Sequence, residues 1–233
     1  MVEMAVNVID MDFAGIDLQH APINAQDNVN LLRAIQVVGP DVTPVVRLPN
    51  HDVYWIQQSL DAGFTCLIVP LVESADEARA LVRSTYFPPV GARSMAGSIR
   101  ASLYGVEVAE MNQHTILLPQ IESVTGLDHV EEILDVEGVT GILLGPEDLS
   151  LSSGWRGKDI WNYDPFLKAV ERVLSACRER NKLAAILTTA YQEATRAGFD
   201  IIGIGGDLGA VRVTVKESIN QKLNEMRQLG EST

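Results

Sequence analysis

Seven short apolar runs, separated by stretches with helical patterns, restrict the fold of this chain more than any other feature. The runs are rich in β-branched residues and are continuous rather than alternating, which is typical of strands buried on both faces. They occupy residues 13–18, 43–48, 66–71, 115–121, 140–145, 183–188 and 200–205. The helical patterns cover residues 28–38, 53–63, 75–86, 125–135, 164–180 and 208–229. The order of strand then helix, repeated seven times, predicts a parallel sheet.

Such a sheet is either an open doubly wound sheet or a closed (β/α)8 TIM barrel. No GxGxxG or GxxxxGK[ST] motif follows the first run, so the usual sign of a nucleotide-binding open sheet is missing and we favour the barrel. Only seven strands are visible, and residues 1–10 resemble part of a helix that precedes the first of them. We therefore expect a single barrel domain over residues 1–233 that is short at its N-terminus and lacks the first strand. Loss of one strand would leave two sheet edges in a barrel that normally has none.

Composition excludes several classes of protein. Apolar residues make up 46% of the chain and charged residues 21%, as in globular proteins with a substantial core. The formal charge of −13 removes any long-range attraction to nucleic acid or to anionic membranes. Both cysteines, Cys66 and Cys177, lie in apolar stretches and are expected in the core. Since no run approaches a membrane span and no signal-peptide pattern opens the chain, we expect a cytoplasmic protein.

Polar residues gather at the ends of the expected strands. In a parallel α/β barrel the loops after the strands converge on an open mouth, where the chemistry takes place. The residues at these ends are Asp17, His20, Arg47, Gln120, Glu122, Asp148 and Asp207. We expect them to form a polar ring contributed by separate strands.

Glu122 and Asp148 lie on the strand-to-helix loops PQIES and GPEDLS. Two carboxylates on adjacent strands can reach one point above the barrel, and oxygen ligands of this kind suit a hard cation such as Mg²⁺ or Mn²⁺. The alternative is that both residues cap the helices that follow them. The sequence alone leaves both interpretations open.

Arg47 and His20 are the candidate catalytic groups beside these carboxylates. A guanidinium at the mouth can hold a carboxylate and stabilise an oxyanion, although it can also form a strand-end salt bridge. An imidazole can accept and return a proton near neutral pH. His51, His114 and His129 lack such neighbours in the sequence and are interpreted as surface residues.

Several motifs, in one order and over nearly the whole chain, resemble the HpcH/HpaI class II pyruvate aldolases. They are DFAGIDLQHAP, PVVRLPNHD, LDAGFTCLIVPLVESADEA, YFPPVGARS, LPQIES, ILDVEGVTGILLGPEDLS and GIGGD. The resemblance implies a TIM barrel of the phosphoenolpyruvate/pyruvate-binding type. It also implies an aldolase that uses Mg²⁺, Mn²⁺ or Co²⁺ to cleave or form 4-hydroxy-2-oxo acids through a pyruvate enolate. Homo-oligomers, hexamers or trimers of dimers, are implied as well, with a final helix near residues 208–228 that is exchanged between subunits.

The resemblance assigns roles residue by residue. Glu122 and Asp148 match the metal ligands, Arg47 the arginine that contacts the keto oxygen, and His20 the histidine that moves the proton. Asp61 matches an aspartate associated with that histidine. The substrate-binding positions that the resemblance implies are Arg47, Gln120, Gly145, Pro146 and Asp17. No lysine ends an expected strand, which agrees with chemistry that needs no Schiff base.

Asp61 raises a question of geometry, and Gln19 departs from the family's usual pattern. Asp61 lies near the end of its expected helix, far from the mouth, so either a neighbouring subunit supplies it to His20 or Asp17 is the local partner. The family often has Asp-x-Glu-His where this chain has Gln19 before His20, which removes a charge near the base. We expect the reaction class to survive this change.

Other activities remain open at this level. Oxaloacetate decarboxylation, or trapping of the enolate by another electrophile, would use the same residues. A catalytically silent binding or assembly subunit is a third possibility. A CoA-thioester lyase would be expected to have a more basic entrance than a charge of −13 supports. Specificity is expected to depend on loop residues such as Arg93, Ser94, Arg100 and Trp155.

Overall fold

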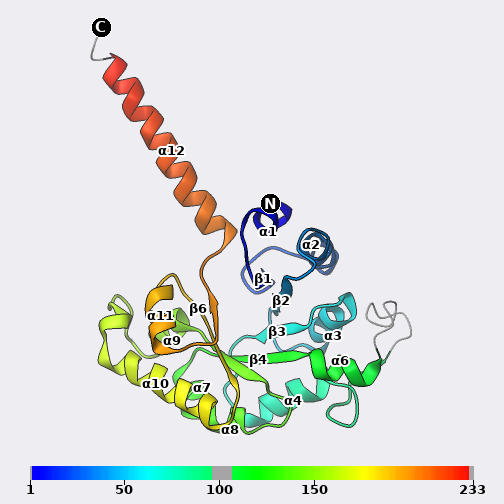
Figure 1. Cartoon of the computed structure of the whole chain (residues 1–233). Helices are drawn as coiled ribbons and strands as arrows, with labels where there is room; N and C mark the ends of the chain where they lie inside the picture. Colours follow the sequence, from blue (N-terminus) through cyan, green and yellow to red (C-terminus); the bar gives the residue numbers. More distant parts are fainter. Residues whose placement is uncertain (1, 96–106, 231–233) are drawn as a thin grey trace.

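A curled, seven-stranded parallel sheet covered by helices forms the body of the protein (Figure 1). The structure is a computed structural model that describes residues 2–95 and 107–230. The strands are β1 (Phe13–Asp17), β2 (Thr43–Arg47), β3 (Cys66–Val69), β4 (Ile116–Ile121), β5 (Gly141–Leu144), β6 (Leu183–Leu187) and β7 (Ile201–Gly203). They are paired in the order β1-β2-β3-β4-β5-β6-β7, and each pair is parallel.

The helices follow the strands as a barrel requires. They are α1 (Val2–Val8), α2 (Ala25–Val38), α3 (Val53–Ala62), α4 (Ala75–Thr85), α6 (Val108–His114), α7 (Val124–Asp128), α8 (Val130–Leu134), α9 (Pro146–Ser152), η1 (Ile160–Asn162), α10 (Asp164–Glu179), α11 (Tyr191–Ala197) and α12 (Asp207–Gly230). The predicted strands and the predicted opening helix are confirmed. The helix expected over 125–135 is divided at His129, and α6 and α11 were not expected.

The sheet is a barrel that lacks one strand, as the sequence predicts. No backbone pairing joins β1 to β7 within residues 2–95 and 107–230, so the curled sheet is open between these strands. Each of the two outer strands is therefore paired on one side only. The opening between β1 and β7 is where an eighth strand would lie in a closed barrel.

Strand alternation separates the two faces of the sheet. Residues facing outward, such as Val46, Leu67 and Ile142, join the large core beneath the helices. The inward-facing residues form a second, smaller cluster: Val45, Cys66, Leu118, Leu143 and Ala185. Because neighbouring positions alternate between the faces, the inward set continues to Arg47 on β2 and to Gln120 on β4. The interior is therefore apolar at its base and polar at the strand ends.

Local sequence fixes the beginnings of the helices that surround the mouth. Asp52 caps α3 by accepting a hydrogen bond from the Tyr54 N–H at 2.9 Å. Ser74 caps α4 by accepting from the Glu77 N–H at 3.2 Å. Such caps satisfy backbone donors that the first helical turn leaves unpaired. The loops after β2 and β3 are thereby held at defined positions.

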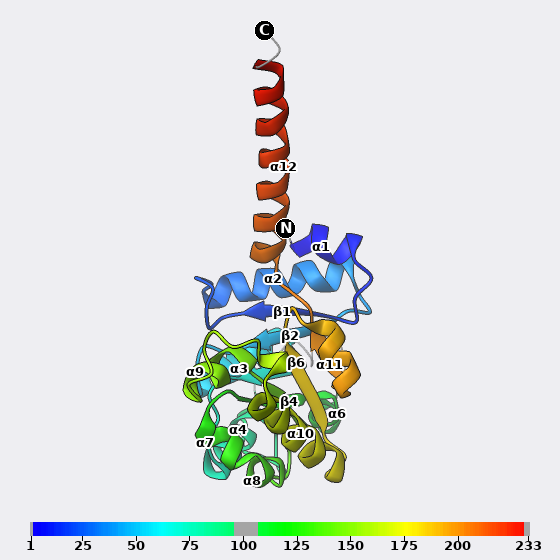
Figure 2. The same cartoon turned by 90° about the vertical axis from the view of Figure 1, so that its left-hand side faces the viewer.

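The final helix, α12, extends away from the body of the protein (Figures 1 and 2). Every side chain of α12 that the structure describes is exposed. Its exposed apolar residues are Leu208, Val211, Val213, Val215, Ile219, Leu223 and Met226. In the described part of the chain, α12 included, no helix has the length and apolar character needed to cross a membrane.

Candidate active site

Asp17 and Arg47 form a bidentate ion pair at the ends of β1 and β2. The strand register places the two residues directly opposite each other. Arg47 donates from Nε to Asp17 Oδ1 at 2.9 Å and from Nη2 to Oδ2 at 2.6 Å. Burial by itself would raise the pKa of Asp17, but the hydrogen bonds and charge of Arg47 outweigh it and lower the pKa. Asp17 is therefore held as a carboxylate.

The same carboxylate shapes the loop that carries His20. Asp17 Oδ1 accepts hydrogen bonds from the backbone N–H groups of Gln19 at 3.0 Å and His20 at 3.3 Å. An aspartate that bonds to backbone donors two and three residues later fixes a tight turn. The His20 side chain is exposed, and among the described residues its ring has no hydrogen-bond or ion-pair partner. The ring is therefore open to solvent beyond the end of β1.

Glu122 follows β4 and points inward, where it is only 4% exposed. Its Oε1 accepts a hydrogen bond from the Leu71 N–H at 2.7 Å, and its Oε2 accepts one from Gln120 Nε2. The cap of α7 is supplied by Ser123, which accepts from the Gly126 N–H at 3.0 Å. The capping alternative for Glu122 is thus excluded by geometry.

Asp148 places a second carboxylate next to Glu122. It lies in the first turn of α9, whose cap residue is Gly145 and which has no side-chain cap. Burial raises the pKa of Glu122, and the negative charge of Asp148 raises it further, while the hydrogen bond from Leu71 works in the opposite direction. Like charges brought together in this way disfavour ionisation unless a cation separates them.

Gln120 and Gly145 complete the wall around this pair. A Cβ atom at Gly145 would lie 2.7 Å from Glu122 Cβ and 3.0 Å from Gln120 Nε2, so a glycine is required at this close approach. Gln120 is 2% exposed, and its Oε1 has no hydrogen-bond partner. A buried acceptor without a partner is costly unless a donor or a cation is supplied.

These residues fit a divalent cation. Two carboxylates that repel each other, with an unpaired amide oxygen beside them, are donors of the type that Mg²⁺ and Mn²⁺ prefer. No Lys, Arg or His forms an ion pair with either carboxylate in the part of the chain that the structure describes. No group of three or more His, Cys, Asp or Glu side chains is arranged for a metal among the described residues. A cation held by two carboxylates would have its other positions open to substrate and water.

Asp61 lies elsewhere in this chain. It is half-buried on α3 and accepts a hydrogen bond from Arg93 Nη2 at 2.5 Å. Arg93 is 6% exposed and packs over the Phe87 ring, 4.5 Å from the ring centroid. The structure therefore pairs Asp61 with Arg93, and within one chain it brings Asp61 into no contact with His20.

The remaining residues that the sequence predicts for the mouth or for specificity differ in burial and position. Pro146 is buried as the first residue of α9, whereas Asp207 is exposed at the beginning of α12. Ser94 is exposed, and Trp155 packs edge-on against Tyr163 and Phe166. Arg100 lies outside the described residues.

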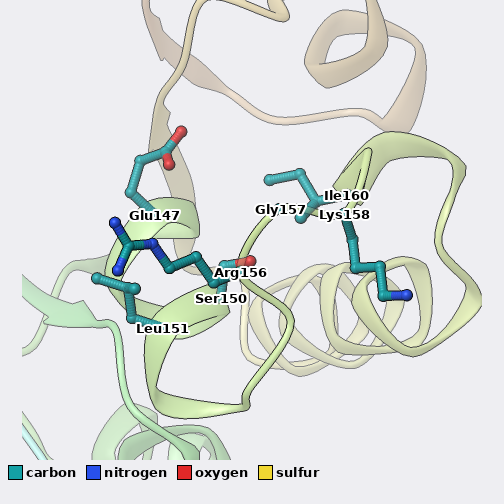
Figure 3. Close-up of a pocket in the computed structure, with 7 residues that line it drawn as sticks. All are labelled: Glu147, Ser150, Leu151, Arg156, Gly157, Lys158 and Ile160. Atoms are coloured by element: carbon teal, nitrogen blue, oxygen red, sulfur yellow. The ribbon is translucent and has the colours of Figure 1, made fainter.

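A cavity of about 410 Å³ lies along α9, beside the helix turn that carries Asp148. Figure 3 shows its lining: Glu147, Ser150, Leu151, Arg156, Gly157, Lys158 and Ile160. Arg156 is exposed and forms no ion pair among the described residues. An unpaired guanidinium in a cavity along α9 was not expected from the sequence.

His51 differs from its interpretation as a surface residue. Its ring is half-buried, and Nε2 lies 2.7 Å from the carbonyl oxygen of Pro70. The sequence shows only that His51 follows the apolar run 43–48 by three residues, and the partner is 19 positions away. No local signal could have identified this contact.

Comparison with known proteins gives a consistent result. The family profile described as HpcH/HpaI aldolase/citrate lyase matches residues 2–213. A 5-keto-4-deoxy-D-glucarate aldolase from Klebsiella pneumoniae is 33% identical over 218 residues, covering 91% of this chain and 82% of the relative. The crystal structure of an HpcH/HpaI aldolase/citrate lyase family protein from Burkholderia cenocepacia has a TM-score of 0.85 and 30% identity, covering 97% of this chain and 89% of that one. The fold is also shared with CitE from Mycobacterium tuberculosis in complex with magnesium and pyruvate, with a TM-score of 0.51, 17% identity, and coverage of 82% of this chain and 74% of that one.

Proposed function

Since the chain belongs to the HpcH/HpaI aldolase/citrate lyase family and is a carbon–carbon lyase, we propose that it is a divalent-metal-dependent aldolase acting on 4-hydroxy-2-oxo acids. The reaction cleaves such an acid into pyruvate and an aldehyde, or joins the two, through the enolate of pyruvate. The observation that carries the proposal is the adjacent, uncompensated carboxylate pair of Glu122 and Asp148.

Glu122 and Asp148 are the proposed ligands of the cation. When bound, a divalent cation such as Mg²⁺, Mn²⁺ or Co²⁺ acts as a Lewis acid and template for a 2-oxo acid. Gln120 holds Oε2 of Glu122, the Leu71 N–H holds Oε1, and Gly145 leaves the space that both groups need. Gln120, Gly145 and Pro146 are the proposed walls of the pyruvate site.

Arg47 is the proposed partner of the developing oxyanion. Cleavage of the C3–C4 bond leaves negative charge on the former keto oxygen, where a preorganised cation is most effective. Asp17 occupies Nε and Nη2 of Arg47, and Nη1 has no hydrogen bond to the described residues. The ion pair thus fixes the orientation of the guanidinium and leaves one edge for substrate.

His20 is the proposed proton carrier. An imidazole nitrogen takes the proton of the C4 hydroxyl group, the C3–C4 bond breaks, and the aldehyde leaves. The bonding electrons become the enolate, which regains a proton at C3 to give pyruvate. Asp17 positions this base by accepting from its backbone N–H. Asp61 is 35% exposed even though it is paired with Arg93, which is consistent with its reaching His20 of another subunit in an oligomer.

Homo-oligomerisation is part of the proposal. Figure 2 shows that α12 leaves the body of the subunit, and the apolar side chains along this helix are exposed. A helix of this kind gains stability by packing on a second copy of the chain. We propose that α12 is exchanged between the subunits of a hexamer or trimer of dimers.

The acceptor half of the substrate is proposed to be anionic. The relative from Klebsiella pneumoniae is named for 5-keto-4-deoxy-D-glucarate, a dicarboxylate, which makes this compound the first to test. Arg156 offers an unpaired guanidinium in the cavity beside α9. A guanidinium and a carboxylate form a strong, directional pair.

The decisive experiment measures pyruvate release from 5-keto-4-deoxy-D-glucarate by protein that has been stripped of metal with a chelator. No pyruvate is expected until Mg²⁺ or Mn²⁺ is added, and the rate should then be restored. Oxaloacetate, tested beside it, separates aldol cleavage from decarboxylation. Pyruvate release that is unaffected by the chelator would contradict the proposal, as would tight metal binding without turnover of any 2-oxo acid.

A further inference from the structure

A single peptide unit connects His51 to Glu122. The peptide bond between Pro70 and Leu71 directs its carbonyl oxygen to His51 Nε2 at 2.7 Å. Its N–H group donates to Glu122 Oε1, also at 2.7 Å. A carbonyl oxygen can only accept, so Nε2 of His51 is the donor. One planar group therefore lies between the imidazole and the carboxylate.

The backbone of Leu71 has an unfavourable conformation. Leu71 has a φ of 51°, in the left-handed region that residues other than glycine rarely adopt. Its side chain is 52% exposed, so packing of the leucine does little to hold this conformation. The next N–H, that of Val72, donates to the Gln120 carbonyl at 3.2 Å. The loop is kept in place by the hydrogen bonds that its N–H groups donate to Gln120 and Glu122 at the end of β4, rather than by packing of Leu71.

His51 is itself fixed on a short, ordered turn. The Asp52 N–H donates to Asn50 Oδ1 at 2.9 Å, and Asp52 then caps α3. The ring is half-buried between this turn and the loop after β3. Its donor group is thus presented to the Pro70 carbonyl by a rigid support.

We propose that His51 is a positioning residue for Glu122, an inference that rests on the proposed role of Glu122 as a metal ligand. The hydrogen bond to the Pro70 carbonyl fixes the orientation of the peptide, so that the Leu71 N–H stays directed at Oε1. It also polarises the peptide and strengthens the N–H as a donor. Glu122 is thereby held in place despite its burial and the charge of Asp148.

The test compares three variants of the protein. His51→Leu removes the donor, whereas His51→Gln keeps an amide donor on a side chain of similar reach. His129→Leu is the matched control, because His129 Nδ1 also lies near a backbone carbonyl, that of Thr125 at 2.9 Å, on the outer helices. Far-UV circular dichroism and melting temperatures verify that each variant is folded.

The first measurement is the dissociation constant of Mn²⁺, obtained by electron paramagnetic resonance without substrate. Loss of a group that orients a metal ligand typically weakens binding by 10- to 100-fold, so we expect His51→Leu to weaken it by about tenfold. His51→Gln and His129→Leu should bind as the wild type does. Equal binding by His51→Leu and the wild type would overturn the proposal, as would equally weak binding by both His51 variants.

The second measurement is hydrogen exchange of the Leu71 amide in the metal-free protein, followed by NMR. We expect this amide to be protected in the wild type and in His51→Gln, and to exchange at least about tenfold faster in His51→Leu. Unchanged exchange in His51→Leu would refute the role of His51. Because this measurement needs no metal, it separates a failure of this inference from a failure of the proposed function.

Discussion

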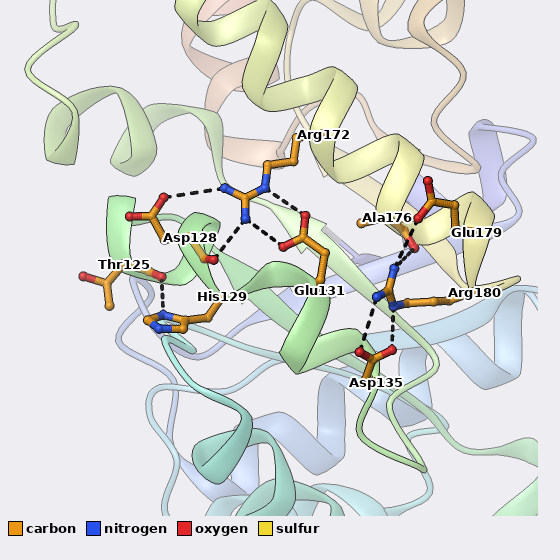
Figure 4. A network of polar contacts seen from close by, with 9 residues as sticks. All are labelled: Thr125, Asp128, His129, Glu131, Asp135, Arg172, Ala176, Glu179 and Arg180. Atoms are coloured by element: carbon orange, nitrogen blue, oxygen red, sulfur yellow. Dashed lines mark hydrogen bonds and ion pairs between the residues drawn. The ribbon is translucent and has the colours of Figure 1, made fainter.

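The carboxylates Glu122 and Asp148 at the barrel mouth and the charged residues that join the outer helices follow opposite rules. On the outside, Arg172 of α10 contacts Glu131 at 2.7 Å, and Arg180 contacts Asp135 at 2.7 Å (Figure 4). The hydrogen bonds from these arginines lower the pKa of both carboxyl groups. At the mouth, burial and then the charge of Asp148 raise the pKa of Glu122.

This difference separates residues that hold the fold together from residues that are kept for chemistry. On the outside, Glu131 and Asp135 are each paired with an arginine of α10 or its C-cap, and these ion pairs tie α10 to α8. Glu122 and Asp148 have no such partner among the described residues, although a nearby cation would relieve their repulsion. Perturbed groups of this kind are characteristic of functional sites. The contrast also predicts which substitutions change activity and which change only stability.

The largest expected effect is the loss of activity in Glu122→Gln. The amide keeps the shape of the side chain but removes the charge that holds the cation, so kcat/KM should fall on the order of 10³-fold, from a loss of several kcal/mol. Steady-state assays of pyruvate release, with saturating Mn²⁺, measure the change. Glu132→Gln removes an exposed carboxylate on α8 and is the control. A fully active Glu122→Gln enzyme would break the comparison.

The second prediction concerns Arg47→Lys. Lysine keeps the charge but cannot donate to both oxygens of Asp17 or orient a planar edge toward substrate. We expect kcat/KM to fall by roughly 10²-fold, the size of effect seen when an oxyanion donor is lost. A structural role would lower the melting temperature without changing kcat. Assays of pyruvate release from 5-keto-4-deoxy-D-glucarate measure kcat/KM, and thermal melts of the same preparations measure stability. Together they distinguish the two roles.

The third prediction concerns Arg156→Ala in the cavity beside α9. If Arg156 binds the second carboxylate of the substrate, KM for 5-keto-4-deoxy-D-glucarate should rise by about tenfold, since a charge-assisted hydrogen bond contributes about 1.5–3 kcal/mol. The rate with oxaloacetate should change little. Arg178→Ala, an exposed arginine on α10, is the control. Equal effects on both substrates would remove Arg156 from acceptor recognition.

The fourth prediction is that Glu122→Gln stabilises the metal-free fold near neutral pH. A raised pKa means that the folded state favours the protonated form. Stability from this group is therefore present below the unfolded value of 4.5 and is lost as pH rises through the folded pKa. Glutamine mimics the protonated acid, and the unpaired Oε1 of Gln120 can accept from its amide after a flip. We therefore expect the Tm of the metal-free variant to lie above that of the metal-free wild type at neutral pH.

Thermal melts of metal-free wild type and variant across acidic and neutral pH measure this effect. The gap between the two melting curves should close as pH falls toward 4.5, where the wild-type carboxyl group is itself protonated. A variant that is less stable than the wild type at neutral pH would show that the charge of Glu122 is compensated. Activity and stability would then no longer oppose each other at this residue.

Part of this site could be predicted from sequence, because barrel topology places strand ends together. Asp17, Arg47 and Glu122 end separate apolar runs, and that position alone put them at the mouth. The bidentate pairing of Asp17 with Arg47 depends on strand register, which no local pattern encodes. The contact between His51 and Pro70 depends on where two loops meet, so it too required the structure.

Fold prediction shows the same limit. Continuous apolar runs identified the strands, since a buried parallel strand is apolar on both faces. The helix α11 (Tyr191–Ala197) was missed, because its seven residues bury only Ala194 and show no clear apolar face. The helix expected over 125–135 is broken at His129, whose ring binds the Thr125 carbonyl at 2.9 Å. Short elements shaped by tertiary contacts lack the periodic signal that longer ones carry.

The smallest expected effect is that of Glu131→Gln on the outer helices. The pKa of Glu131 is lowered, chiefly by the hydrogen bonds from Arg172, so its stabilisation is present above the unfolded value of 4.5 and is lost as pH falls through the folded pKa. Both side chains are more than one-third exposed, and exposed ion pairs contribute only about 0–1 kcal/mol. We expect Tm to fall by about 1–3 °C at neutral pH, with kcat/KM unchanged. The Tm of Glu131→Gln should fall further below that of the wild type as pH rises from acidic to neutral, whereas the Tm of Glu122→Gln should rise further above it. The same trend for both variants would mean that the mouth and the outer helices do not differ in how they treat charge.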